Sequence, residues 1–407
     1  MSWLNNPKIV NDFLKHVSRM NDRDTEATTP AISRRSVVAS MALLPLFGAC
    51  AIPGSRNDPR YYTPSGLPLR RVQVSADRVI RTVAGLRPFR SSGFVVRAER
   101  LGDKTVVHNY GHGGGGITLS WGTSHLAMEL ALQTGCRSCA VIGCGAVGLA
   151  SATLMLRQGW DVTIYARDLP PRTTSNIAGA QWSPASVFDR EAVSDPFYAE
   201  LRTAMEQSYR YFQGLVGHRY GVRWVSNYML ADRPFAPDDL FGRHSDMYPE
   251  FRTLHRDEHP FPAPYARHFA TMFIEPPVYL PAVMHDYYAA GGKIVVRDFA
   301  ERAELTSLGE PVIINCTGLG SRELFGDAEL VPVKGQLSVL LPQADINYLM
   351  IYQGIYMFPR KDGVLLGGTF ERNSSSLTPN EAESARILRQ HEAFFAAMQD
   401  PWSTSLP

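Results

Sequence analysis

The sequence predicts an α/β fold in which a Rossmann-like domain is joined to a second, α+β domain built on an antiparallel sheet. Three observations lead to this prediction. A glycine-rich turn at residues 143–148 follows an apolar strand and opens a helical pattern. Helical and β-rich segments then alternate up to residue 315, as in chains that return repeatedly to one sheet. Three β-rich runs follow between residues 335 and 370, and Lys361, Asp362 and Gly363 predict a hairpin turn between two of them.

The composition is that of an ordinary globular protein. Of the 407 residues, 44% are hydrophobic and 20% are charged, as in typical folded domains. Lys and Arg number 41 against 39 Asp and Glu, so the chain lacks the basic excess that binding to nucleic acid requires. No apolar run reaches the ~18 residues of a membrane-spanning helix, and five cysteines are too few for a disulfide scaffold.

Residues 1–52 resemble an export leader. Arg34 and Arg35 precede an apolar run at 37–46, which is the pattern of a bacterial twin-arginine signal. The small residues before Cys50 resemble a lipoprotein processing site, so we expect a periplasmic protein or one anchored to the membrane through a lipid on Cys50. The alternative is a plain N-terminal helix with two surface arginines, in a cytoplasmic protein. Residues 53–71, rich in Pro, Gly and Ser, predict a linker.

Folded structure is expected from about Val72 onward. Short runs of β-branched and aromatic residues predict two strands, at 94–96 and 106–107. Beyond them, helical and extended patterns alternate, with an irregular Pro-rich stretch at 234–264. The predicted helices are 121–132, 147–158, 198–215, 279–290 and 379–398, and the remaining predicted strands are 139–142, 162–165, 222–226, 293–297, 312–315, 335–341, 350–358 and 364–370.

The glycine-rich turn has the G-x-G-x-x-G spacing of a dinucleotide-binding fingerprint. Gly143 makes the tight turn, Gly145 lets the backbone approach a pyrophosphate, and Gly148 lets the helix pack closely on the strand. Ala146 and Val147 open the helix, whose free N–H groups and partial positive charge attract the pyrophosphate. The strand and helix on either side of the turn make a dinucleotide site the favoured interpretation over a chance glycine turn.

The end of the next strand bears on which dinucleotide binds. Asp168 stands where an acidic residue takes the ribose hydroxyls of the adenosine. Arg167 beside it suits a 2′-phosphate and so favours NADP. The fingerprint by itself therefore leaves FAD and a nicotinamide cofactor open.

Motifs outside the fingerprint carry a resemblance. The sequence contains H-N-Y-G-H-G-G at 108–114, A-G-A-Q-W at 178–182, I-N-C-T-G at 314–318, G-Q at 335–336 and G-G-T at 367–369. Together these resemble the D-amino-acid oxidase family of flavoenzymes over most of the chain from Leu86 to Phe370. The resemblance implies FAD as cofactor, with 72–184 and 311–335 in an FAD-binding domain, and 185–310 (mostly) and 336–400 in a substrate domain.

The resemblance also implies roles for single residues. Arg87 corresponds to the arginine that holds the substrate carboxylate in a planar, bidentate fork. Tyr352 and Tyr356 correspond to two tyrosines that flank the substrate, and their spacing of four on one predicted strand would place them on one face. The Gly114 carbonyl corresponds to an acceptor for the substrate amine. The residues expected to bind FAD are Gly113, Gly116, Ile117, Thr118, Gly143, Gly145, Ala146, Val147, Gly148, Arg167, Asp168, Thr173, Thr174, Ser175, Gln181, Trp182, Thr317 and Gly318.

The order of the segments differs from that of the family. In D-amino-acid oxidases the fingerprint lies at the N-terminus, and the counterparts of residues 85–90 and 108–118 come near the C-terminus. Here both precede Gly143. We infer a circular permutation in which the old termini are joined through residues 134–138 and the chain is reopened after the helix at Asn380. The competing explanation, a decayed fragment fused ahead of a truncated enzyme, predicts duplicated or lost motifs, and the sequence contains neither.

The resemblance implies an oxidase that deaminates D-amino acids or related amines. A hydride passes from the α-carbon to the flavin, O2 reoxidises the flavin with release of H2O2, and the imino acid hydrolyses to a 2-oxo acid and ammonia. The alternatives are an NAD(P)-dependent dehydrogenase built on the same fingerprint and a catalytically silent flavin-binding protein. No metal site is expected, because His108 and His112 lack a third ligand at a suitable spacing.

Overall fold

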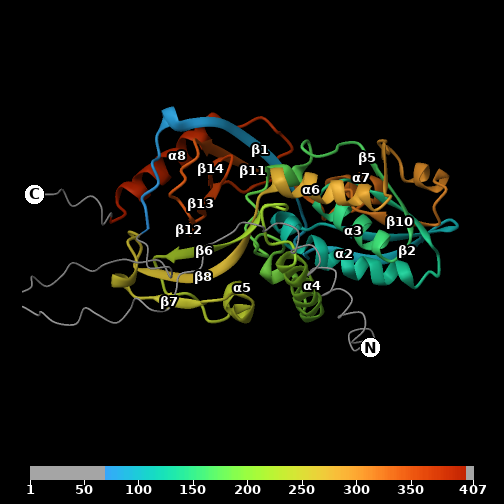
Figure 1. Ribbon diagram of the computed structural model, residues 1–407, viewed down its shortest axis with the longest axis horizontal. Helices are drawn as coiled ribbons and strands as arrows, with labels where there is room; N and C mark the ends of the chain where they lie inside the picture. The colour runs from blue at the N-terminus through green and yellow to red at the C-terminus, as the bar shows by residue number, and fades with distance from the viewer. Residues whose placement is uncertain (1–68, 400–407) are drawn as a thin grey trace, which may run out of the picture. The chain divides into compact units, whose positions relative to one another are not determined.

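The computed structural model describes residues 69–399, which form two β-sheets with helices packed against them (Figure 1). Residues 1–68 and 400–407 lie outside the described residues, and with them the predicted leader, Cys50 and nearly all of the predicted linker. Between residues 69 and 399, no helix combines the length and the apolar character needed to cross a membrane.

The first sheet has six strands in the order β2-β3-β10-β4-β5-β9. Neighbouring strands from β3 to β9 are parallel, and β2 is antiparallel to β3. The central strand β4 is buried on both faces, which explains why its sequence is continuously apolar rather than alternating. The strands are β2 (Val95–Leu101), β3 (Lys104–Tyr110), β4 (Ser138–Ile142), β5 (Asp161–Ala166), β9 (Lys293–Val296) and β10 (Val312–Asn315).

Helices form two layers on one face of this sheet. The inner pair, α2 and α3, packs on the strands, while α4 packs on α2 and α6 packs on α3. The opposite face is covered by a 3-10 turn at Arg302–Ser307 and by α7 (Ser321–Phe325). The layered helices are α2 (Gly116–Leu132), α3 (Ala146–Arg157), α4 (Asp195–Gln213) and α6 (Pro276–Ala289).

The second sheet has nine strands, with the order β1-β11-β14-β13-β12-β6-β8-β7 and β15 paired with β11. All neighbours are antiparallel except β12 and β6, which are parallel. The strands are β1 (Val79–Phe89), β6 (Val222–Ala231), β7 (Arg252–Leu254), β8 (Tyr265–Ile274), β11 (Val331–Leu340), β12 (Tyr348–Tyr352), β13 (Ile355–Arg360), β14 (Gly363–Gly367) and β15 (Glu371–Arg372), and a short helix, α5 (Leu240–Arg243), precedes β7.

The last helix, α8 (Glu381–Ala396), covers one face of the second sheet (Figure 1). It begins at Asn380, whose side-chain oxygen accepts hydrogen bonds from the first free N–H groups of the helix. Phe394 and Phe395 are buried against the sheet. The opposite face of the sheet, which carries Leu337 and Phe358, lines the cavity described below.

Each predicted helix and strand has a counterpart, but the strand predicted over 350–358 is two strands. β12 ends at Tyr352 and β13 begins at Ile355. The two residues between them, Gln353 and Gly354, have φ angles of 47° and 82°, as a two-residue hairpin with the twist of its strands requires. The sequence conceals this turn, because glutamine is not a residue that signals a positive φ.

The predicted domain boundaries need one correction. β1 falls within the predicted FAD-binding segment 72–184, yet it pairs with β11 in the second sheet. This error arises because strand pairing is set by partners far apart in the chain, which local sequence patterns do not report. β9, which pairs with β5 in the first sheet, belongs to the part of 185–310 that the prediction left outside the substrate domain.

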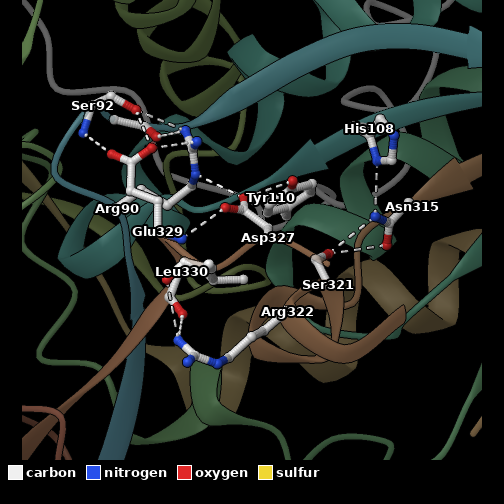
Figure 2. Close-up of polar contacts among 12 residues, drawn as sticks. Arg90, Ser92, His108, Tyr110, Asn315, Ser321, Arg322, Asp327, Glu329 and Leu330 are labelled. Atoms are coloured by element: carbon white, nitrogen blue, oxygen red, sulfur yellow. Dashed lines mark hydrogen bonds and ion pairs between the residues drawn. The ribbon is translucent and has the colours of Figure 1, made fainter. Parts of the chain in front are cut away.

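Polar contacts connect the segment before residue 138 to the segment after residue 311 (Figure 2). Asp327 forms an ion pair of 2.9 Å with Arg90 and accepts a hydrogen bond of 2.8 Å from the hydroxyl of Tyr110. Glu329 pairs with Arg90 at 2.6 Å and also accepts from the backbone N–H of Ser92. These contacts hold β1 and β3 against the chain that connects β10 to β11.

A second set of polar contacts is centred on the side chain of Asn315, which is completely buried. The side-chain amide of Asn315 donates to Nδ1 of His108 at 3.1 Å and to the hydroxyl of Ser321 at 3.0 Å (Figure 2). The Asn315 oxygen accepts from the backbone and the hydroxyl of Thr317. His108 therefore fixes the turn after β10, which is a structural role.

The two carboxylates that pair with Arg90 should differ in their contribution to stability. Asp327→Ala removes a carboxylate that is only 12% exposed and leaves Arg90 and Tyr110 without it, so we expect the free energy of unfolding to fall by about 2–4 kcal/mol. Glu329→Ala removes the 37% exposed partner of the same arginine and should cost less than about 1 kcal/mol. Urea denaturation of both variants measures the difference, and equal losses would contradict it.

Candidate functional site

A cavity of about 1460 Å³ lies between the two sheets. The first sheet contributes the carboxyl ends of β4, β5 and β10, the edge at which open α/β sheets bind ligands. The second sheet contributes residues of β1, β11, β12 and β13. The lining includes every residue of the predicted site except Gly148, Trp182 and Tyr352.

The glycine-rich turn has the backbone geometry that the fingerprint predicts. Gly143 has a φ of 112°, a conformation that favours glycine. A Cβ at Gly143 would also lie only 3.0 Å from the carbonyl carbon of Cys316 on the neighbouring strand. A Cβ at Gly148 would lie 2.8 Å from the carbonyl carbon of Gly143 and closer still to its oxygen. Gly148 therefore acts behind the cavity wall, where it lets α3 pack against the turn.

The loop after β5 reaches the beginning of α3. Thr173, Thr174 and Ser175 all line the cavity, and the hydroxyl of Ser175 accepts a hydrogen bond of 3.1 Å from the backbone N–H of Ala146. Thr317 and Gly318 approach from the end of β10. These segments surround the helix N-terminus, which attracts anions through its free N–H groups and dipole.

The arginine at the end of β5 is held by carboxylates. Nε of Arg167 donates to Asp168 at 2.9 Å, and a second carboxylate, Asp298, lies 3.9 Å from its guanidinium. The hydrogen bond to Asp168 raises the pKa of Arg167 above its ordinary value. Because two carboxylates offset its charge, Arg167 is poorly placed to select a 2′-phosphate, and Asp168 remains a candidate for the ribose hydroxyls.

The glycine cluster between β3 and α2 forms the opposite wall. The backbone N–H of Gly114 donates to the carbonyl of Ser186 at 2.8 Å, and Gly113 has a φ of 53°. The hydroxyl of Thr118 donates to the carbonyl of Ser183 at 2.9 Å. Gly113, Gly114, Gly116, Ile117 and Thr118 thereby line the cavity as one continuous segment.

His112 fixes this segment from inside. Its Nε2 lies 2.9 Å from the hydroxyl of Thr123, and its ring stacks on Phe94 with centroids 5.6 Å apart. Complete burial lowers the pKa of His112 to about 3, so the imidazole is neutral at physiological pH. A neutral, hydrogen-bonded imidazole supports the wall without adding charge to the cavity.

Arg87 extends from β1 into the cavity with no carboxylate beside it. Its Nη1 donates to the backbone carbonyl of Thr369 at 3.3 Å, and its guanidinium lies 5.8 Å from the ring centre of Phe370. Its Cδ lies 3.7 Å from the Cβ position of Gly114, so these two predicted site residues are neighbours. Among residues 69–399, Arg87 forms no ion pair, and its positive charge is available to an anion.

Tyr356 faces the cavity, whereas Tyr352 does not. Tyr356 is paired across the hairpin with Ile351, and both residues line the cavity. Tyr352 lies on the opposite face, where its ring packs on Phe394 with centroids 5.1 Å apart and its hydroxyl donates to Asp232 at 2.7 Å. The prediction that the two tyrosines share a face is wrong, because the turn at 353–354 places them on different strands.

Trp182 is the other predicted residue that lies away from the cavity. Its side chain is completely buried, and it packs against Tyr209 and Tyr248. Gln181, its neighbour in the motif, does line the cavity and donates to the side chain of Asn227 at 2.9 Å. The first four residues of the motif, 178–181, therefore line the cavity, and Trp182 anchors the end of the motif in the core.

Several lining residues were missed by sequence reasoning. Gly335 and Gly368 belong to quoted motifs but received no role, and Ile351 and Phe370 carried no signal beyond hydrophobicity. Ser186 has a φ of 58°, a backbone conformation that no sequence pattern announces for serine. These residues are recognisable only once strand pairing has brought them together.

Comparisons with known proteins identify a family for this chain. A family model described as FAD dependent oxidoreductase (DAO) matches residues 138–405. The chain is 29% identical over 258 residues to a D-amino-acid oxidase from Rubrobacter xylanophilus, which spans 62% of this chain and 76% of that protein. It is 29% identical over 255 residues to human D-aspartate oxidase, covering 61% and 73% of the two chains. A solved structure, glycine oxidase from Geobacillus kaustophilus, aligns with 17% identity and a TM-score of 0.49 over 64% of this chain and 78% of that one.

The role of Gly148 can be tested by adding a single methyl group. In Gly148→Ala the new Cβ would collide with the backbone of Gly143. The glycine-rich turn must then open, which distorts the proposed binding site of the nucleotide. We expect purified Gly148→Ala protein to contain much less flavin than the wild type, measured as the ratio of flavin to protein absorbance. Gly309→Ala is the control, because a Cβ there meets nothing within 4 Å. Full flavin content in Gly148→Ala would refute the role.

Proposed function

Since the chain belongs to the DAO family of FAD-dependent oxidoreductases, we propose that it oxidises D-amino acids or related amines to 2-oxo acids. The overall reaction consumes the amino acid, O2 and water, and it releases the 2-oxo acid, ammonia and H2O2. The observation that carries the proposal is Arg87, an arginine without an acidic partner that extends into the cavity beside Gly114. Family membership also makes FAD the cofactor rather than a nicotinamide dinucleotide.

The residues of the cavity fit FAD. The positive φ of Gly143 and the close approach of Cys316 leave no room for a side chain where the pyrophosphate is expected. Asp168 is the proposed partner of the ribose, and Gly116, Ile117 and Thr118 are the proposed contacts of the ring system; all four residues line the same cavity. When bound, FAD accepts the hydride from the α-carbon and passes the two electrons to O2.

The chain's own residues have to orient the substrate. A planar guanidinium binds a carboxylate through two parallel N–H donors, which fixes the direction of the substrate as well as its position. The carbonyl of Gly114 is the proposed acceptor for the amine, and Tyr356 limits the other side. Hydride transfer from a neutral amine depends mainly on such positioning, and the lining around Arg87, made by Gly335, Thr369 and Phe370, offers no carboxylate as a base.

The charge of the lining favours substrates with neutral side chains. Arg87 is the one cation that the second sheet contributes to the described lining, and Leu337, Ile351 and Phe358 are apolar lining residues of the same sheet. A second carboxylate on the substrate would therefore be desolvated without a partner, which is costly. We propose neutral D-amino acids rather than D-aspartate or D-glutamate.

Peroxide release with a panel of D-amino acids tests the proposal. We expect H2O2 with neutral D-amino acids and little with acidic ones. If the flavin is reduced by substrate without H2O2 being formed, the electron acceptor is not O2. If no D-amino acid, N-methyl amino acid or simple amine reduces the flavin, the protein is a flavin-binding protein without this activity.

Arg87→Ala should abolish turnover while leaving the flavin bound. Loss of one member of a charge pair costs several kcal/mol, so kcat/KM should fall by roughly 10²–10³-fold. Arg81→Ala is the matched control, because Arg81 lies on the same strand but pairs with Asp362 and does not line the cavity. Release of FAD from Arg87→Ala, or equal losses in both variants, would contradict the assigned role.

We also propose that the chain is circularly permuted relative to its family. The family model begins at residue 138, and the curated relative from R. xylanophilus is matched over only 76% of its length. The described residues before 138 nevertheless supply Arg87 and Gly114 and pair with both sheets. The two ends of the described chain are also close together, because Arg71 donates to the carbonyl of Met398 at 2.6 Å. This proximity supports a rearrangement that keeps the core contacts.

Reordering the segments tests the permutation. A sequence written as residues 138–399 followed by 69–137 should match the R. xylanophilus oxidase over clearly more than the present 76% of its length. The reordered protein, with a short flexible linker between residues 399 and 69, should also fold and retain FAD. A match that still ends where the present one ends would favour the fused-fragment origin instead.

A further inference from the structure

Two glycines lie on the cavity face of the second sheet, between the strands that carry Arg87 and Tyr356. Gly335 is on β11 and Gly367 is on β14, and the strand order is β1-β11-β14-β13. Tyr356 on β13 is paired directly with Gly367. Arg87 on β1 is two residues from Gly85, the partner of Gly335. Side chains at positions 87, 335, 356 and 367 therefore point to one face of the sheet. Residues paired across two strands share a face, and so do residues two apart on one strand.

Each glycine lies under one of the two functional side chains. A Cβ built on Gly335 would lie 2.5 Å from Cζ of Arg87 and would overlap its Nη2. A Cβ built on Gly367 would overlap Cζ and the hydroxyl of Tyr356. The guanidinium and the phenol ring therefore occupy the space that a side chain on the neighbouring strand would fill.

Backbone conformation does not explain either glycine. Neither Gly335 nor Gly367 has a positive φ, so any residue type could adopt the backbone conformation of these two positions. Glycine weakens the interior of a strand, since it loses the most conformational freedom and has no side chain to pack. The space that each glycine leaves for Arg87 or Tyr356 is the remaining physical reason for its presence.

The contacts of Arg87 show what this space achieves. With Gly335 beneath it, the guanidinium donates to the carbonyl of Thr369 at one edge. That carbonyl is itself fixed, because the hydroxyl of Thr369 accepts from the backbone N–H of Gln336 at 2.7 Å, and Arg386 donates to the preceding carbonyl, Gly368, at 3.0 Å. A rotation of the guanidinium would direct its remaining donors away from a common carboxylate.

From this arrangement we infer that Gly335 and Gly367 are positioning residues of the substrate site. Gly335 sets the height and plane of the Arg87 guanidinium, and Gly367 does the same for the Tyr356 ring. The inference rests on the proposed function for the identity of the ligand, a small 2-amino or 2-oxo carboxylate. The atoms that an added Cβ would meet are the ends of flexible side chains, so an alanine should displace Arg87 or Tyr356 and leave the strand pairing intact.

The first experiment measures carboxylate affinity rather than turnover. Pyruvate and its uncharged amide, pyruvamide, are titrated into the flavin-loaded wild type, Gly335→Ala and the surface control Gly309→Ala, with the flavin absorption spectrum as readout. We expect Gly335→Ala to weaken pyruvate binding by about 10–100-fold, with pyruvamide binding and flavin content unchanged. Wild-type affinity for pyruvate in Gly335→Ala, or an equal loss for both ligands, would overturn the role of Gly335.

The second experiment does not depend on any ligand. Thermal unfolding is compared for the wild type, Gly367→Ala, Tyr356→Ala and the double variant, because neighbouring residues that compete for one space are not additive. We expect Gly367→Ala to lower the melting temperature by roughly 2–4 °C in the wild type and to have no such effect once Tyr356 is alanine. The same cycle applies to Gly335→Ala and Arg87→Ala.

The outcomes of the two experiments separate the inference from the proposed function. Equal effects of the glycine substitutions with and without Tyr356 or Arg87 would overturn the inference, since the glycines would then serve only the sheet. Coupled effects in a protein that binds no pyruvate would retain the positioning role and refute the proposed substrate class.

Discussion

The pairing of β1 with β11 is the constraint on which the cavity depends. It runs from Val79 opposite Leu340 to Phe89 opposite Val331, and it fixes Arg87 beside the backbone of Gly335 and Thr369. From the end of β1 the chain continues directly into β2 and β3 of the first sheet. One continuous segment therefore connects the strand that carries Arg87 to the strand that leads into Gly113 and Gly114. The relative position of these residues follows from the pairing of β1 with β11 and of β3 with β10, rather than from a flexible loop.

The electrostatics of the cavity depend on which of its basic side chains have an acidic partner or are uncharged, and which keep a positive charge without such a partner. At the nucleotide end Arg167 is offset by Asp168 and Asp298, and the buried His112 is kept neutral by desolvation. At the other end Arg87 has no acidic partner among residues 69–399. On the face that the second sheet contributes, an anion therefore meets the Arg87 guanidinium beside apolar side chains, where an ion pair with good geometry is stronger than in water.

Sequence reasoning predicted what depends on local pattern. The fingerprint and the strand and helix on either side of it follow from a short motif with a stated backbone requirement, as at Gly143. Most of the residues that the family resemblance implied for the site do line the cavity. The predictions were wrong where they depended on which residues pair between neighbouring strands. Tyr352 and Tyr356 were assigned to one strand because Gln353 gives no sign of a turn, and β1 was placed with the wrong sheet because its partner β11 lies at the other end of the chain. β1 also contains Gly85 and Pro88, residues that weaken a strand pattern in the sequence but that an edge strand tolerates.

The glycines at the cavity and beneath its side chains fall into two classes, according to whether a positive φ or a neighbouring side chain explains the absence of a Cβ. Gly143 and Gly113 have positive φ, so glycine is favoured there by the backbone itself. Gly335 and Gly367 have ordinary extended backbone, and only the side chain seated on each of them explains the absence of a Cβ. A substitution of the first class disturbs the chain and with it the cofactor, whereas one of the second class disturbs Arg87 or Tyr356 alone. In the proposed site, the cofactor end is thus shaped by backbone conformation, whereas the Arg87 and Tyr356 side chains at the proposed substrate end rest on the backbone of a neighbouring strand.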